Sequence, residues 1–415
     1  MSSIEKLCLR AEQAEKSVPF LNTNEKNKAL ILIAEELEKE SEDILSANRT
    51  DVENAKKKGM SLPLIDRLRL NKDRIDSMSD GLRQIASLQD ITGRIKEMNV
   101  RPNGLRIGVK TVPLGIIGII YEARPNVTTD AFGLCFKTGN VTILKGGSDA
   151  IESNKAVVNA VRNGLKKAGI TQDAVLLIED TTRESTMEMM KMDQYLDVLI
   201  PRGGKSLIQT VVKNSTVPVI ETGTGNCHIY VDKGADLHMA VDIIDNAKTQ
   251  RLGVCNACES LVIHRDTAKK VVPMIVDRLT EKGVEIRGDE EAVKIDGRIV
   301  PADEQDWGTE YLDAVISLKI TGTLEEAVEH INKYNTGHSE AIVTKDYDHA
   351  MYFQDRVDAA AVYVNASTRF TDGNEFGFGA EIGISTQKLH ARGPMGMEAL
   401  TTTKYIILGN GQIRP

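Results

Sequence analysis

An uninterrupted apolar run at residues 115–121, GIIGIIY, limits what this chain can fold into more than any other feature of its sequence. A strand with one face in water alternates apolar and polar residues, whereas this run fits a strand that is buried on both faces. Similar short runs alternate with helical stretches after Arg106, which is typical of a parallel sheet with helices on both faces. Strands are expected at 141–145, 174–178, 197–200 and 217–220, and helices near 128–138, 149–168, 182–191 and 203–213.

A second series of alternating segments begins after Gly225. The strands expected there span 228–231, 259–264, 314–320, 340–343 and 360–364, and the helices lie near 236–250, 266–282, 323–335 and 346–357. The sequence therefore predicts an α/β protein with two parallel-sheet units that join near residue 226.

The N-terminal residues 3–90 lack strand-like runs and are rich in Glu, Lys, Leu, Ile and Ala. Leu30 and Ile33 belong to an apolar series at helical spacing, Thr23 is suited to an N-cap, and Gly59 is suited to a helix stop. We expect two or three amphipathic helices that pack on the first unit.

Two strand-like segments, 101–110 and 404–408, stand apart from the alternating pattern. We expect them to pair into a protruding β-structure, which is an arrangement that commonly serves oligomerisation.

The composition excludes several classes of function. Of the 415 residues, 41% are hydrophobic and 27% are charged, as in soluble proteins of two or three domains. The net charge of -8 gives no attraction to a nucleic-acid backbone. No apolar stretch follows Met1 as in a signal peptide, and none reaches the roughly 20 residues that span a bilayer. We therefore predict a cytoplasmic protein with no nucleic-acid or membrane partner, and with its odd number of cysteines, five, reduced.

Cys255 is the strongest candidate nucleophile. It follows an expected helix, precedes an expected strand, and has Gly253 beside it to let backbone approach closely. A thiol in such a loop is open to a cleft, and cysteine becomes a potent nucleophile once its pKa is lowered. The alternative is a buried, inert cysteine, which is the common state of a free thiol.

Two further stretches could contribute to a site. Glu221 follows an apolar strand, at the sheet edge where α/β proteins bind ligands, and could act as a base; otherwise it is a cap or a solvated turn residue. Residues 145–149, KGGSD, close a strand and open a helix, so that Lys145 and free backbone amides could hold an anion. An ordinary capped turn explains the same residues equally well.

A zinc site is the alternative use of the cysteines. Cys255 and Cys258 form a C-x-x-C pair, and Cys227 precedes His228. Structural zinc sites generally show two such pairs in small, loop-rich modules, whereas this pair enters an expected strand. We therefore predict no metal.

Together, these motifs and their order resemble the aldehyde dehydrogenase superfamily over nearly the whole chain. Within it, four stretches are similar to those of the γ-glutamyl phosphate reductase family, also called glutamate-5-semialdehyde dehydrogenases: YEARPNVT at 121–128, DVLIPRGG at 197–204, VCNA at 254–257 and LHARGPMG at 389–396. The resemblance implies NADPH-dependent reduction of L-glutamyl 5-phosphate to L-glutamate 5-semialdehyde with release of phosphate, the second step of proline biosynthesis. The reaction would pass through a thioester on Cys255.

The resemblance also implies a domain organisation and a set of site residues. It implies an aldehyde dehydrogenase-like fold of two Rossmann-like parallel-sheet domains plus a small β oligomerisation element. The cofactor-binding domain would comprise 1–97 and 113–226, completed by 366–393; the catalytic domain 227–365; and the oligomerisation element 98–112 and 394–415. The implied residues are Cys255, Asn126 and Glu221 for catalysis, Lys145, Gly146, Ser148, Gly203 and Glu310 for NADPH, and Arg124, Arg202 and Arg392 for the phosphate and α-carboxylate of the substrate.

Three expectations concern specificity and partners. Ser148 stands where NAD-using relatives commonly have an acidic residue, so NADP is expected to bind better than NAD, although Asp149 lies next to it. A homo-oligomer is expected, and glutamate 5-kinase is an implied partner. The alternatives are an acylating dehydrogenase that uses coenzyme A, a cysteine hydrolase and a non-catalytic binding module. Cys258 either packs in the core or resolves an oxidised Cys255 as a disulfide.

Overall fold

The computed structural model describes residues 1–122 and 124–414. Ala123, within the motif at 121–128, and Pro415, at the end of the expected oligomerisation element, lie outside the described residues. The chain divides into two units: unit 1 comprises 1–221, 377–383 and 395–415, and unit 2 comprises 222–376 and 384–394. The expected segment 366–393 is thus shared between the two units.

Unit 1 is built on a four-stranded parallel sheet in the order β5-β4-β3-β6. Its strands are β3 (Ile116–Tyr121), β4 (Val141–Lys145), β5 (Val175–Leu177) and β6 (Val198–Arg202). Every residue of β3 and β4 is buried, as the apolar runs predicted. The expected strand 217–220 forms only an isolated bridge between Leu199 and Val219.

Helices cover this sheet. They are α1 (Ser3–Glu15), α2 (Thr23–Lys39), α3 (Ser41–Lys57), α4 (Leu62–Leu68), α5 (Lys72–Ser87), α6 (Asn126–Lys137), α7 (Ile151–Lys167), α8 (Arg183–Met189) and α9 (Lys205–Asn214). The expectation of two or three helices before residue 90 was wrong, because five form there. Helix α2 packs on α5 and α7, and α5 packs on α6, which joins the N-terminal helices to the sheet layer.

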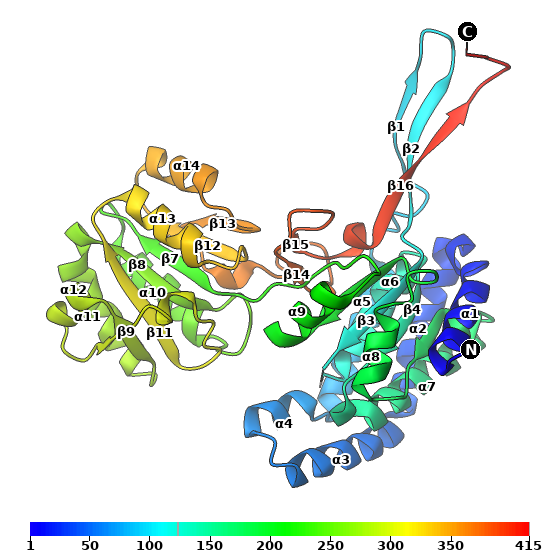
Figure 1. Ribbon diagram of the computed structural model, residues 1–415, viewed down its shortest axis with the longest axis horizontal. Coiled ribbons are helices and arrows are strands. Elements are labelled where there is room, and N and C mark those ends of the chain that lie inside the picture. The colour runs from blue at the N-terminus through cyan, green and yellow to red at the C-terminus, as the bar shows by residue number, and fades with distance from the viewer. Residues whose placement is uncertain (123, 415) are drawn as a thin grey trace. The chain divides into compact units, whose positions relative to one another are not determined.

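A separate three-stranded antiparallel sheet belongs to unit 1 and extends away from its helices (Figure 1). It contains β1 (Ile95–Val100), β2 (Arg106–Pro113) and β16 (Thr401–Leu408), with β2 in the centre. The predicted pairing of the two isolated strand-like segments is confirmed, since Leu408 lies opposite Arg106 and Thr401 opposite Pro113. All residues of β1 are exposed.

Unit 2 contains a seven-stranded parallel sheet in the order β10-β9-β11-β8-β7-β12-β13. The strands are β7 (Cys227–Val231), β8 (Cys258–His264), β9 (Glu285–Gly288), β10 (Val300–Pro301), β11 (Val315–Thr321), β12 (Ser339–Val343) and β13 (Ala361–Val364). The short antiparallel pair β14 (Ile384–Ser385) and β15 (Gly393–Pro394) lies outside it.

The two faces of this sheet are covered by different helices (Figure 1). Helices α10 (Leu237–Thr249), α11 (Arg265–Thr280) and α12 (Glu290–Ile295) pack with Ile229 and Leu261 on one face. Helices α13 (Leu324–Tyr334) and α14 (Tyr347–Arg356) pack with Tyr230 and Val262 on the other. Because neighbouring residues of one strand serve opposite faces, both must be apolar, and the predicted doubly covered parallel sheet is confirmed.

Candidate active site

The cofactor residues predicted in unit 1 gather at the carboxyl edge of its sheet. Strands β3, β4 and β6 end at Tyr121, Lys145 and Arg202, and Tyr121 lies directly opposite Arg202. Gly146 and Gly203 each follow one of these strands, and Ser148 opens the short 3-10 helix η2 (Ser148–Ala150). Ligands of open parallel sheets bind at this edge, where the strand order reverses.

Lys145 is a buried amine at this edge. Only 3% of its surface is exposed, and burial lowers the pKa of its ammonium, which nearby Asp180 partly offsets. Beside it, Asn154 Nδ2 is buried without a hydrogen-bond partner, and a Cβ built on Gly146 would lie 2.2 Å from that nitrogen. A buried donor without an acceptor calls for a partner, and ribose hydroxyls or a phosphate supply one. These residues therefore fit a nucleotide.

Glu122 ties β3 to the loop after β6. Its Oε2 accepts a hydrogen bond from the Gly204 amide at 3.0 Å, and a Cβ on Gly203 would lie 2.7 Å from its carboxyl carbon. A side chain at position 203 would therefore have to displace the ends of the Glu122 and Leu207 side chains.

Asn126 and Arg202 both act on Asp130 of α6. Asn126 Nδ2 donates to Asp130 Oδ2 at 3.0 Å. Burial raises the pKa of Asp130 to about 6, which the Asn126 hydrogen bond and the charge of Arg202 oppose. Arg124 is exposed just before α6, and Glu221 is a half-buried residue at the end of unit 1. The predicted catalytic and substrate roles of these residues stay predictions.

In unit 2, Cys255 lies in the loop between α10 and β8, as the sequence predicted. It is half-buried, and the Ala257 amide donates to the Val254 carbonyl at 3.1 Å, which closes a turn around it. The other cysteines are buried. Burial raises the pKa of Cys258 and, most strongly, that of Cys227, so the accessible thiol of the loop is Cys255.

The segment that leads into β7 contacts the backbone of Cys255. A Cβ built on Gly225 would lie 1.4 Å from the Cys255 carbonyl oxygen, and Cys227 Sγ donates to that oxygen at 3.2 Å. Glu310 Oε1 accepts the Gly225 amide at 2.7 Å. Glu310, which was expected to bind the nicotinamide ribose, therefore holds Gly225 in the segment that contacts the Cys255 backbone.

Asn256 anchors the loop from the other side. The Asn256 Nδ2 donates to the Thr371 carbonyl at 3.0 Å and to the Arg369 carbonyl at 3.3 Å. The Asn256 carbonyl accepts a hydrogen bond from Thr368 Oγ1 at 2.7 Å. Arg369 Nη1 in turn donates to Asn256 Oδ1. The 3-10 helix η5 (Thr368–Phe370) thus fixes the residue next to the nucleophile.

A buried ion pair closes the base of the loop. Lys248 Nζ lies 2.5 Å from Glu259 Oε2, and neither side chain is exposed. Glu259 Oε1 also accepts the Leu312 amide at 3.1 Å, near Glu310. Burial raises the pKa of Glu259 to about 7, which Lys248 opposes.

Arg392 already has a carboxylate partner in this structure. Its Nη2 lies 2.6 Å from Asp358 Oδ1, and Lys388 Nζ lies 2.6 Å from Asp358 Oδ2. Its predicted contact with substrate stays a prediction. The cysteines form no metal-binding cluster: among residues 1–122 and 124–414, no three His, Cys, Asp or Glu side chains are grouped to hold an ion.

The contribution of Arg369 and Asn256 was missed by sequence reasoning. Arg369 reaches the loop across 113 residues of chain, so no local pattern indicates the contact. Asn256 belongs to the VCNA stretch at 254–257, and its position next to Cys255 could have indicated that it helps to fix the loop.

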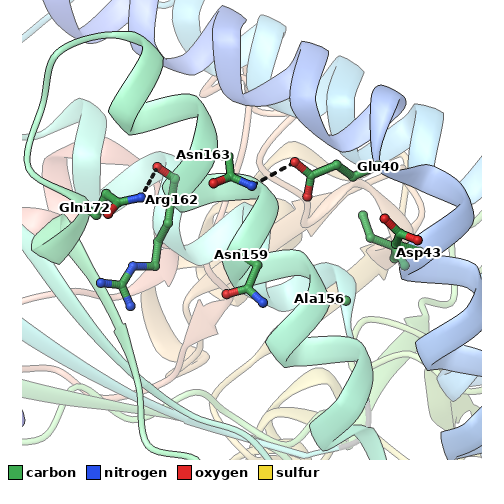
Figure 2. A pocket seen from close by; sticks show the side chains of 8 residues that line it. Glu40, Asp43, Ala156, Asn159, Arg162, Asn163 and Gln172 are labelled. Carbon is green, nitrogen blue, oxygen red and sulfur yellow. Dashed lines mark hydrogen bonds between the residues drawn. The ribbon is translucent and has the colours of Figure 1, made fainter.

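A cavity of unit 1 lies elsewhere. Its volume is about 500 Å³, and it is lined by residues of α3, α7 and neighbouring turns. Figure 2 shows the side chains of these residues. Some of the cavity's polar groups are hydrogen-bonded to one another: Asn163 Nδ2 donates to Glu40 Oε1 at 2.9 Å, and Gln172 Nε2 donates to the Arg162 carbonyl at 3.1 Å. No predicted site residue lines it.

Known proteins are similar to this chain in sequence and in fold. The family model described as aldehyde dehydrogenase family matches residues 2–296 and 298–406. The chain belongs to the aldehyde dehydrogenase family. It is 60% identical over 414 residues to the gamma-glutamyl phosphate reductase of Lachnospira eligens, with all of both chains covered. Membership in the gamma-glutamyl phosphate reductase group, which four motifs predicted, is confirmed.

Solved structures of this family show the same fold. The crystal structure of gamma-glutamyl phosphate reductase from Thermotoga maritima has 50% identity and a TM-score of 0.98, with all of both chains covered. The glyceraldehyde-3-phosphate dehydrogenase GapN of Methanocaldococcus jannaschii, solved in complex with NADP, has 19% identity and a TM-score of 0.71 over 98% of this chain and 94% of that one. The predicted aldehyde dehydrogenase-like α/β fold is confirmed. Within the described ranges, no helix has the length and apolar character that crossing a membrane demands.

Proposed function

We propose that this member of the family reduces L-glutamyl 5-phosphate to L-glutamate 5-semialdehyde and releases phosphate, the second step of proline synthesis from glutamate. The observation that carries the proposal is the full-length, 60% identity to a gamma-glutamyl phosphate reductase. The half-buried Cys255, fixed by Gly225 from one side and by Asn256 from the other, supports it.

Cys255 is the nucleophile of this reaction. Its thiolate attacks the acyl carbon, the bond from that carbon to the phosphate oxygen breaks, and phosphate leaves with the bonding electrons. A bound nicotinamide supplies the hydride that the resulting thioester accepts. Hydride addition leaves an oxyanion on the former carbonyl. Its electron pair re-forms the carbon–oxygen double bond as the carbon–sulfur bond breaks, which yields the aldehyde and the Cys255 thiolate. The backbone amide of Cys255 is the donor for the oxyanion of the tetrahedral intermediates.

NADPH is the reductant of this proposal. Lys145, Gly146, Ser148 and the orphan amide of Asn154 would hold its adenosine ribose and 2′-phosphate. Asp149, which stands close in sequence and would repel that phosphate, is paired with Lys58 Nζ at 3.0 Å. Serine at 148 can donate to a phosphate, whereas an acidic residue would disfavour it.

The proposal extends to the setting of the enzyme. Five free cysteines suit the reducing cytoplasm. The exposed β1-β2-β16 sheet supports a homo-oligomer, and glutamate 5-kinase, which makes the unstable acyl phosphate, remains a proposed contact.

The test is the reverse reaction. Purified protein supplied with glutamate semialdehyde, phosphate and NADP should form NADPH, which is followed by its absorbance. Coenzyme A in place of phosphate should give none, and a rate that requires coenzyme A would support the other acylating dehydrogenases instead.

Cys255→Ala should abolish turnover while NADPH still binds in a fluorescence titration. Cys8→Ala is the matched control, because Cys8 is buried in α1 and burial raises the pKa of its thiol to about 11. Substantial activity in Cys255→Ala contradicts the thioester mechanism.

A further inference from the structure

Two arginines flank the nucleophile loop of unit 2. Arg369 Nε donates to Gln250 Oε1 at 2.9 Å, and its Nη1 donates to Asn256 Oδ1. The guanidinium is therefore attached to the loop both before and after Cys255. Arg251 stands in the same loop, and its charge acts on Arg369.

The charges of these two arginines are only partly balanced within the chain. Burial lowers the pKa of Arg369, Arg251 lowers it further, and Cys255 and Asp372 oppose the shift. Among the residues that the structure describes, neither Arg369 nor Arg251 forms an ion pair with a carboxylate. By contrast, Arg392 is paired with Asp358. The charge of the exposed Arg251 acts on the half-buried Arg369 and raises the free energy of the loop, and an anion bound near both arginines would lower it.

We propose that Arg369, assisted by Arg251, binds the phosphoryl group of the substrate at Cys255; this assignment rests on the proposed function. Arginine binds phosphate through paired N–H donors, and the loop hydrogen bonds hold the Arg369 guanidinium in a fixed orientation. The phosphoryl group is joined through an oxygen to the carbon that Cys255 attacks. The α-carboxylate lies at the opposite end of the glutamyl chain. A cation attached to the residue next to Cys255 therefore meets the phosphoryl end.

The same arrangement serves both directions of the reaction. In reduction, Arg369 orients the acyl phosphate and stabilises the phosphate as it leaves. In the reverse reaction, it binds inorganic phosphate for attack on the thioester. Arg369 thereby selects phosphate over water or a neutral nucleophile as the partner of the thioester.

Reverse kinetics separate the two ends of the substrate. Arg369→Gln should raise the KM for phosphate by about tenfold to a hundredfold, the usual effect of a lost charged hydrogen bond, and change the KM for glutamate semialdehyde by less than about threefold. Arg369→Lys, which keeps the charge but loses the planar fork, should lie in between. Arg356→Gln is the matched control, because Arg356 lies over the ring of Tyr352 on α14, and it should leave both constants unchanged.

A second variant guards against a folding defect. Arg251 is exposed, so Arg251→Gln removes a charge without removing a loop hydrogen bond, and it should raise the KM for phosphate by roughly threefold to tenfold. An unchanged KM for phosphate in both Arg251→Gln and a folded Arg369→Gln overturns the proposal. A rise confined to the KM for the semialdehyde also overturns it, and assigns the arginines to the α-carboxylate.

Alkylation gives a readout that needs no turnover. Inorganic phosphate should slow the reaction of Cys255 with iodoacetamide in the parent protein, relative to sodium chloride at equal ionic strength, and this protection should vanish in Arg369→Gln. Equal alkylation rates with and without phosphate in the parent protein contradict the site. Phosphate protection in a protein that forms no NADPH with semialdehyde and phosphate would instead leave the anion site standing and overturn the proposed function.

Discussion

At the scale of single residues, the position of Cys255 depends on a glycine 30 positions before it. Gly225 passes so close to the Cys255 carbonyl that any side chain would displace one of the two backbones. Such a contact joins segments that are distant in sequence, and a single sequence does not contain it. The place of Cys255 in a helix-to-strand loop could be predicted, because the helix before it and the strand after it each follow from a local pattern.

Gly225→Ala should therefore reduce activity strongly and destabilise unit 2 by about 1–3 kcal/mol, the usual cost of overpacking. Gly234→Ala is the matched control, since a Cβ there meets no atom within 4 Å. Steady-state rates and thermal unfolding of both variants check this. A Gly225→Ala enzyme with parental kcat would show that the loop tolerates the shift.

Cofactor choice is a second matter of single residues. Ser148→Glu should weaken NADPH binding by roughly tenfold or more and affect NADH less, because a carboxylate repels the 2′-phosphate. Ser77→Glu, an exposed serine on α5, controls for the added charge. Competitive titration of the two cofactors measures the ratio, and tighter binding of NADH than NADPH by the parent protein would refute the proposed preference.

At the scale of elements, apolar periodicity located the buried strands, but not every boundary. Residue 22, an asparagine, caps α2 with Glu25, whereas Thr23 was expected; the asparagine side chain accepts the Glu25 amide at 3.1 Å. Gly59 ends α3 as expected, with a φ of +75°. The charged region 283–313, where β9, α12 and β10 form, shows no clear period, and packing against β11 decides its structure.

Three buried histidines make unit 2 sensitive to acid. Burial lowers the pKa of His228 and His330 to about 3 and that of His338 to about 4. The unfolded chain binds these protons near pH 6.5, while the folded state does not. Stability from each histidine is therefore complete above pH 6.5 and is lost as pH falls toward the folded value.

When the pH falls from about 7.5 to about 5.0, the unfolding free energy of the parent protein should decrease. In His338→Gln this decrease should be smaller by about 2 kcal/mol. Trp307, the single tryptophan, lies in unit 2 and reports its urea unfolding by fluorescence. His238→Gln, on the exposed side of α10, should keep the parental pH dependence. Equal losses in the parent and His338→Gln would contradict the assignment of this proton to His338.

At the scale of the whole molecule, the exposed β-sheet of unit 1 is the surface that we expect to bind a second copy. On β16, Tyr405 is 72% and Ile407 60% exposed, and β1 is an unpaired sheet edge. Apolar side chains on an exposed edge favour strand pairing between chains. The pairing of β2 with β16 was predictable from two strand-like segments. The surface of a second copy that this sheet would contact was not predictable from the sequence.

Ile407→Lys should shift the protein toward single chains in size-exclusion chromatography with light scattering. Phe20→Lys is the control, because Phe20 is an exposed apolar residue outside this sheet. An unchanged mass in Ile407→Lys would show that the sheet is not the interface.

The division of the chain carries a consequence for its evolution. The backbone passes from one unit to the other after residues 221, 376, 383 and 394, so unit 1 is encoded in three gene segments and unit 2 in two. A recombination event that exchanges either unit must preserve all four junctions at once. The two units are therefore harder to exchange by recombination than two domains that follow one another along the chain.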